Sequence, residues 1–253
     1  MYRILYLIML IVVISCGESH DRTSKPHTSN ETTNFPSSFA KGLNAHGGLD
    51  KWNSYRGLKF SVVHKQDTTR HTIDLGTRDE LIEKEGHYKL GFSGDDIHIY
   101  PVKDSFPNEN PKFYQNLLFY FFGMPFVVAD EGANQKVIED GILDGTSYDR
   151  ILITFGDSVG IAPEDQYVLW FDKETQMLRL INYSVTYFDA SKAQQYSAIV
   201  FNQWQEIDGL KMPAEMVGYR WENDQLGDER YRRYFIDVDF DEDAPDPTLF
   251  KAK

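Results

Sequence analysis

Residues 167–188 read YVLWFDKETQMLRLINYSVTYF, and residues 196–221 read YSAIVFNQWQEIDGLKMPAEMVGYRW. Val, Ile, Tyr, Phe, Trp and Thr dominate both stretches, and these residue types fit the pleated surface of a β-sheet. Turn residues interrupt each stretch, at 172–175 in the first and at Asp208 and Gly209 in the second. An Asp-Gly pair between two such runs is a strong hairpin signal, because the turn needs positive φ at its central residues. The two stretches therefore predict two successive β-hairpins.

Shorter runs of the same kind, separated by turn residues, occupy most of the remaining chain. The expected strands lie at 58–65, 71–75, 80–84, 88–92, 97–100, 136–142, 148–155 and 230–240. In the last of these, Tyr234, Ile236, Val238 and Phe240 are expected to share one face, with Arg233, Asp237 and Asp239 on the other. With the two hairpins this gives eleven or twelve strands and predicts a mainly β (α+β) domain with antiparallel pairing.

Two segments have helical patterns. The first, residues 36–55, is weakened or kinked at Gly47 and Gly48, and His46 beside them is interpreted as a packing or capping histidine. The second, residues 111–129, reads PKFYQNLLFYFFGMPFVVA, with Asn108 or Asn110 as its expected cap. It is apolar nearly all round, and such a helix is buried or faces lipid. It either fills the sheet as a core helix or lines an apolar ligand cavity.

The N-terminus has the pattern of a targeting signal. Residues 1–16 read MYRILYLIMLIVVISC, in which Arg3 precedes an apolar run that is too short to cross a bilayer. Residues 13–16 resemble a bacterial lipobox, which makes Cys16 the expected lipidation site and explains the chain's only cysteine. We expect a signal peptide at 1–15, a flexible tether at 16–36 and a single domain at 37–253.

Composition narrows the classes of function. The formal net charge of −13 repels phosphate backbones and anionic headgroups, which argues against nucleic-acid binding and against electrostatic adhesion to membranes. Membrane attachment is therefore expected through the lipid anchor alone. At 41% hydrophobic residues, the chain has enough apolar side chains for a sizeable core.

The sequence contains apparent catalytic and metal-binding motifs, but the other residues that these motifs require are missing. Residues 156–160 match G-x-S-x-G around Ser158, but a hydrolase triad needs a later histidine and the last one is His98. The acidic run 237–243 has Glu242 where a calcium loop needs glycine. The histidines lack the spacing of a zinc site. No catalytic residue, metal ligand or cofactor is therefore predicted.

Four segments resemble a known family. FDKETQMLRLINY (171–183) and FNQWQEIDGLKMPAEM (201–216) are similar to the C-terminal half of LolA/LppX-like bacterial lipoprotein domains. LNAHGGLDKW (43–52) and FYFFGMPFVVAD (119–130) resemble an uncharacterised family of lipoproteins of that fold. The resemblance spans about residues 38–250. It implies a strongly curved antiparallel sheet, or half-open β-barrel, covered by an N-terminal helix and a short apolar helix, with a hollow that can hold acyl chains.

The leading hypothesis is a non-enzymatic cell-envelope lipoprotein that binds or carries a lipid or acyl group in the curved sheet. Its predicted cavity lining is aromatic: Phe119, Phe122, Phe126, Trp170, Tyr183 and Trp204. The alternative is a structural or interaction module that docks another envelope protein, with no partner identified, and a hydrolase is disfavoured. The expected location is the bacterial envelope, with the outer membrane favoured and its periplasmic face or the cell surface left open.

Overall fold

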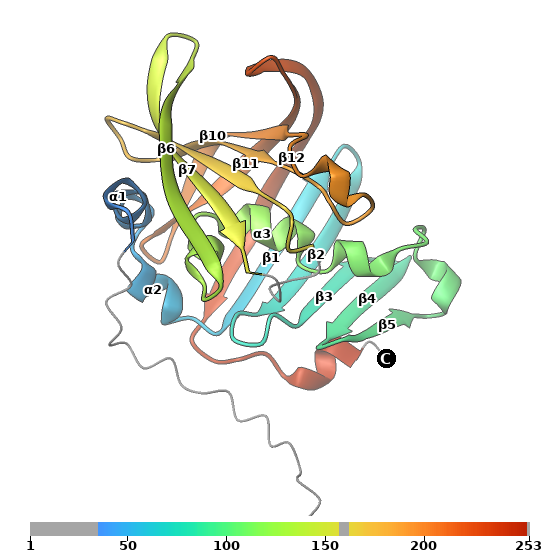
Figure 1. Cartoon of the computed structure of the whole chain (residues 1–253). Coiled ribbons are helices and arrows are strands. Elements are labelled where there is room, and N and C mark those ends of the chain that lie inside the picture. Colours follow the sequence, from blue (N-terminus) through green and yellow to red (C-terminus); the bar gives the residue numbers. More distant parts are fainter. Residues whose placement is uncertain (1–34, 157–161, 252–253) are drawn as a thin grey trace, which may run out of the picture. The chain divides into compact units, whose positions relative to one another are not determined.

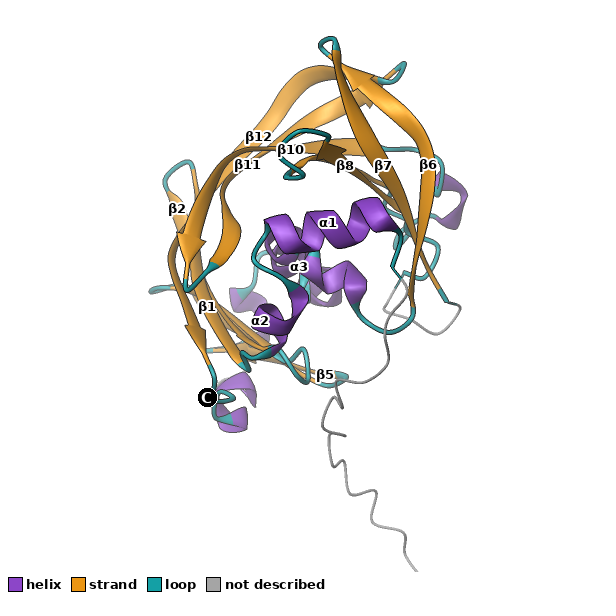
Figure 2. Ribbon diagram, turned by 90° about the vertical axis from the view of Figure 1, so that its left-hand side faces the viewer, coloured by secondary structure: helices purple, strands orange, loops and turns teal. Residues whose placement is uncertain are grey.

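A computed structural model describes residues 35–156 and 162–251. Its framework is one twelve-stranded sheet in the order β5-β4-β3-β2-β1-β12-β11-β10-β9-β8-β7-β6 (Figure 1). Every neighbouring pair is antiparallel. The strands are β1 Gly57–His64, β2 Asp67–Asp74, β3 Glu80–Lys84, β4 Tyr88–Ser93, β5 Asp96–Tyr100, β6 Ala133–Leu143, β7 Thr146–Phe155, β8 Tyr167–Asp172, β9 Leu178–Tyr183, β10 Ser197–Ile207, β11 Leu210–Glu222 and β12 Gln225–Asp241. The sheet curves strongly but stays open, with β5 and β6 as its edges (Figure 2), so the predicted fold class is confirmed.

Both predicted hairpins form at the expected turns. Asp208 and Gly209, between β10 and β11, have φ angles of 50° and 84°, the positive values that this tight turn needs. Between β8 and β9, the Asp172 carboxylate accepts hydrogen bonds from the backbone N–H groups of Glu174 and Thr175 at 3.0 and 2.7 Å. Positive φ angles in one turn and side-chain hydrogen bonds in the other therefore stabilise the two hairpins.

The predicted alternation along β12 is wrong for part of the strand. Tyr234 and Ile236 are 41% and 42% exposed, whereas Phe235 between them is 1% exposed and lies in the core. Asp237 has a φ of 53°, and the pairing with β1 shifts register at this point. The irregularity reverses the alternation, so that Phe240 beyond it returns to the core side.

Three α-helices lie within the curve of the sheet (Figure 2): α1 Ser37–Ala45, α2 Leu49–Asn53 and α3 Leu117–Gly123. Gly47 and Gly48 separate α1 from α2, as expected for a kinked segment. The second predicted helix is shorter than expected, because Asn116, with a φ of 58°, precedes α3 as its N-cap. Residues on either side form 3-10 turns, named η2 Pro111–Tyr114 and η3 Phe126–Ala129.

The helices pack directly on the strands. A Cβ added to Gly42 of α1 would lie 2.3 Å from the Phe171 ring of β8, so only glycine permits this approach. None of the described helices is long and apolar enough to cross a membrane.

Candidate functional site

Helix α3 lies inside the curve of the sheet (Figure 2), and three phenylalanines of α3 and the turn η3 are fully buried. Phe119, Phe122 and Phe126 are each 0% exposed. Phe122 stacks on Phe60 of β1 with ring centroids 4.6 Å apart, and Phe126 stacks on Trp52 of α2 at 5.0 Å. The side chains around these three phenylalanines therefore form a packed core in this conformation.

Tyr183 and Trp204, also predicted as cavity lining, are partly buried against the same core. Tyr183 meets Phe121 with ring centroids 5.0 Å apart, and Trp204 meets the His46 ring edge-to-face at 4.7 Å. Burial lowers the pKa of His46 to about 4, so its ring is neutral at pH 7. Its Nδ1–H donates to the Gly42 carbonyl at 2.8 Å. His46 thus packs within the fold.

Trp170 lies apart from the other five predicted lining residues. It belongs to a second cluster, in which its ring meets Tyr148 and Trp221. Its neighbours on β8, Leu169 and Phe171, lie in the main core instead. Successive side chains of a strand point to opposite faces, so the alternation along β8 was the sequence signal that separates Trp170 from Phe171.

A partly open cleft lies beside the first turn of α3. We call it the aromatic cleft and define it by its apolar and aromatic wall residues: Phe113, Leu117, Tyr120, Phe155, Tyr167 and Tyr187. Its volume is about 450 Å³. Leu117 and Tyr120 line the cleft, whereas Phe119 and Phe122 of the same helix point into the core. Helix α3 therefore separates the aromatic cleft from the packed interior.

The walls of the aromatic cleft come from distant parts of the chain. Phe113 of η2 packs on Tyr187 and Phe188, in the connection between β9 and β10, with ring centroids 5.4 and 4.9 Å apart. Burial raises the pKa values of Tyr120 and Tyr167, so both phenols stay uncharged at pH 7. Each presents an apolar ring with a polar tip.

Four charged side chains also line the aromatic cleft, two cations and two anions. Lys112 lies 3.8 Å from the fully exposed Asp95. Arg78 pairs with Asp130, and its guanidinium group lies 5.2 Å from the centre of the Phe119 ring. Asp165 accepts hydrogen bonds from the backbone and hydroxyl of Thr186, and burial raises its pKa.

Beneath the cleft, a buried network fixes the start of α3. Glu80 of β3 accepts a hydrogen bond from the backbone N–H of Asn116 at 2.5 Å. Its other carboxylate oxygen lies 3.0 Å from Nδ1 of His71, whose Nε2 lies 3.1 Å from the Thr69 hydroxyl. The Asn116 side chain donates to the Arg78 carbonyl at 3.0 Å. Strand β3 thereby sets the position of two cleft residues, Arg78 and Asn116.

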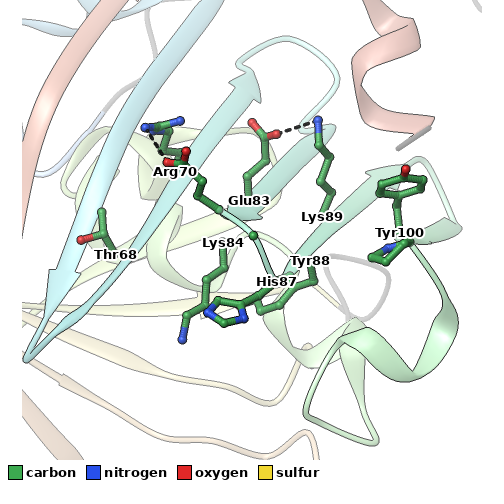
Figure 3. Close-up of a pocket in the computed structure, with 11 residues that line it drawn as sticks. Thr68, Arg70, Glu83, Lys84, His87, Tyr88, Lys89 and Tyr100 are labelled. Carbon is green, nitrogen blue, oxygen red and sulfur yellow. Dashed lines mark hydrogen bonds and ion pairs between the residues drawn. The ribbon is translucent and has the colours of Figure 1, made fainter.

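A second cleft, of about 690 Å³, lies over β2, β3, β4 and β5 (Figure 3). We call it the polar cleft. Its charges compensate one another: Arg70 pairs with Glu85 at 3.4 Å, and Lys89 pairs with Glu83 at 2.9 Å. These pairs are partly or largely exposed, where ion pairs contribute little. The aromatic cleft, with its aromatic walls, is the better candidate for an apolar ligand.

Neither of these two clefts is lined by any of the six residues predicted from the sequence. Sequence reasoning did not select Arg78, Asn116, Tyr120 or Tyr167, because the fold brings them together from separate elements. The signal at Asn116 was its residue type, since asparagine adopts positive φ more readily than most residues.

Within residues 35–156 and 162–251, no group of three or more His, Cys, Asp and Glu side chains is placed to hold a metal ion. Cys16 and Ser158 lie outside the described residues. The lipidation site and the interpretation of G-x-S-x-G as a loop therefore stay predictions.

No protein-family model and no curated protein sequence matches this chain. Among solved structures, the chain is similar to a LolA superfamily protein from Nitrosomonas europaea, with 10% identity, a TM-score of 0.44 and coverage of 79% of this chain and 94% of that one. A DUF1329 family protein from Desulfovibrio piger matches with 11% identity, a TM-score of 0.47 and coverage of 79% and 92%. An outer membrane lipoprotein-sorting protein domain from Vibrio parahaemolyticus matches with 10% identity, a TM-score of 0.39 and coverage of 83% and 97%.

These matches agree with the LolA/LppX-like resemblance seen in the sequence.

Proposed function

We propose that this chain is a non-enzymatic lipoprotein of the cell envelope that binds an apolar molecule, a lipid or acyl group, in the aromatic cleft. The observation that carries the proposal is the lining of that cleft, where five aromatic rings and Leu117 border about 450 Å³. Small-molecule sites are clefts of about 300–1,000 Å³, lined mainly by apolar and aromatic side chains with a few polar groups. The aromatic cleft fits this description in size and in chemistry.

The polar groups suit a ligand with one polar end. Tyr120 and Tyr167 stay neutral, so their rings provide apolar contact without a buried charge. Lys112 and Asp95 are paired with each other at the more exposed part of the cleft. An acyl chain would lie along the rings, and its polar end would meet the charged and amide side chains.

The prediction that Phe119, Phe122, Phe126, Trp170, Tyr183 and Trp204 line a cavity stays a separate proposal. In the described conformation their surroundings are packed, and a ligand would reach the phenylalanines only if residues 111–129 moved away from the sheet. The proposed binding in the aromatic cleft needs no such movement.

A second candidate, a module that docks another envelope protein, is favoured by the filled interior. Phe119, Phe122 and Phe126 are 0% exposed, as expected where the sheet encloses a core rather than a ligand. The two candidates differ in one measurable property, which is whether the purified protein carries a lipid that depends on the aromatic cleft.

The test is organic extraction and mass spectrometry of the full chain purified from envelopes in one detergent. Leu117→Asp places a charge in the cleft, and Ile142→Asp makes the same chemical change at a side chain that is 72% exposed on β6. Lipids that surround the anchor appear in all samples. A lipid present in the wild type and in Ile142→Asp, and depleted in Leu117→Asp, supports the proposal. Identical extracts from all three proteins contradict it.

A further inference from the structure

Two polar atoms beside the aromatic cleft have no hydrogen-bond partner within the described part of the chain. They are Arg78 Nη1, a donor, and Asn116 Oδ1, an acceptor, and both are shielded from solvent. Both side chains line the cleft, and Asn116 is only 9% exposed. Buried polar groups are normally satisfied, so a pair of unmet groups at one cleft indicates a missing partner.

Each of the two side chains is held in place by a hydrogen bond. The Asn116 amide donates through Nδ2 to the Arg78 carbonyl at 3.0 Å, which also identifies the other amide atom as the oxygen. Arg78 is fixed through its other terminal nitrogen, which pairs with Asp130. The backbone of Asn116 is fixed by Glu80. One donor and one acceptor are therefore held on two side chains of the same cleft lining.

We propose that Arg78 and Asn116 recognise an uncharged carboxamide at the polar end of an acyl-chain ligand. This inference rests on the proposed function of the aromatic cleft. An amide supplies what the pair lacks, since its carbonyl accepts from Arg78 Nη1 and its N–H donates to Asn116 Oδ1. A carboxylate only accepts, which leaves Asn116 Oδ1 unmet, and an ammonium group only donates, which leaves Arg78 Nη1 unmet.

The charges of the cleft favour a neutral ligand for a second reason. Arg78 and Lys112 are balanced by Asp95 and Asp165 in the lining itself. Arg78 is in addition already paired with Asp130. A ligand carboxylate would therefore meet a cation whose charge is already neutralised. Its attraction to that cation would not offset the free energy needed to remove the carboxylate from water.

The test uses three photoreactive probes with the same diazirine-bearing decyl chain: decanamide, decanoate and decylammonium. The full chain is placed in phosphatidylcholine nanodiscs, and labelling of the peptide containing residues 111–120 is measured against free probe concentration. Arg78→Lys keeps a cation for Asp130 but removes the second nitrogen. Arg70→Lys is the matched control, because it makes the same change at an arginine that is paired with Glu85 in the polar cleft.

We expect decanamide to label the wild type at the lowest free concentration, and Arg78→Lys to raise the decanamide concentration for half-maximal labelling about tenfold. Arg70→Lys should leave the preference for the amide unchanged. Asn116→Gly, which keeps the positive φ but lacks the amide, should weaken decanamide labelling to a similar extent.

Failure of this inference differs from failure of the proposed function. If all three probes label with equal concentration dependence, or decanoate labels best, the amide preference is wrong while the cleft remains a ligand site. If no probe labels residues 111–120, the cleft is not a ligand site and both proposals fall. Circular dichroism and thermal unfolding verify that each variant folds. The comparison of the three probes on the wild type tests the amide preference without any variant.

Discussion

The Glu80 carboxylate of β3 accepts a hydrogen bond from the backbone N–H of Asn116, 2.5 Å away, and so joins the sheet to the start of helix α3. The same carboxylate contacts His71 at 3.0 Å, and both side chains of that pair are at most 1% exposed. An unmet buried hydrogen-bonding group costs about 1–3 kcal/mol. The position of Asn116 in the wall of the aromatic cleft therefore depends on the buried Glu80 carboxylate.

Glu80→Leu should lower the free energy of unfolding by about 3 kcal/mol or more, because it leaves the Asn116 N–H and the His71 ring without their acceptor. Urea denaturation followed by tryptophan fluorescence measures this loss. Glu83→Leu is the control on the same strand: its partly exposed pair with Lys89 should contribute about 0–1 kcal/mol. Equal losses in the two variants would contradict the role given to Glu80.

His46 should make the fold less stable as the pH falls. Burial lowers its pKa from 6.5 to about 4, so between these values the unfolded chain binds a proton that the folded chain does not. The neutral His46 ring contributes fully to the free energy of unfolding above pH 6.5. About 3 kcal/mol of this contribution is lost when the pH falls to 4.

His46→Gln removes this titration. Its free energy of unfolding, measured by urea denaturation at several pH values, should fall less steeply than that of the wild type between pH 6.5 and pH 4. Parallel pH profiles for the two proteins would show that the His46 ring is not buried as described.

Phe122→Ala should lower the free energy of unfolding by about 3–5 kcal/mol, because Phe122 is 0% exposed and its removal leaves a cavity. Phe188→Ala removes the same ring from a side chain that is 62% exposed, so it should cost about 0.5 kcal/mol or less. Thermal and urea unfolding provide both values. A loss at Phe122 as small as that at Phe188 would mean that the ring borders an open space.

Cys16→Ala should move the protein from the membrane fraction to the soluble fraction, since acyl chains on this cysteine are the expected anchor. Fractionation of envelopes followed by immunoblotting measures the distribution. Ser15→Ala changes the neighbouring residue and should leave the protein in the membrane fraction. Unchanged fractionation of Cys16→Ala would remove the lipoprotein assignment.

The sequence predicted the strand content and the hairpin turns because those signals are local. Asp208 and Gly209 carry their own backbone preference, and the structure shows the expected positive φ at both. The phase of β12 was missed because one irregular residue, Asp237, reverses the alternation, and the residue pattern alone does not reveal it. Regular periodicity therefore predicts a strand better than it predicts which face each residue occupies.

The aromatic cleft lay beyond sequence reasoning for a different reason. Arg78, Asn116, Tyr167 and Tyr187 meet only after β3, α3, β8 and the connection to β10 are in place. Large aromatic residues near the apolar helix are predicted as cavity lining, which stays a prediction; Phe119 and Phe122 lie in the main core and outside both clefts described above. Residue type shows that a side chain will be buried, whereas the fold decides whether it faces a core or a ligand site.

The most direct test of the central claim is to locate a bound acyl chain on the protein. The full chain in nanodiscs is irradiated with the diazirine-bearing decanamide, digested, and the adducts are assigned to residues by tandem mass spectrometry. Binding in the aromatic cleft predicts adducts on Leu117, Tyr120 or Tyr167, and their loss when excess decanamide without diazirine is present. Adducts confined to the polar cleft, at residues such as Arg70 or Tyr100, or no adduct that competes, would contradict the account.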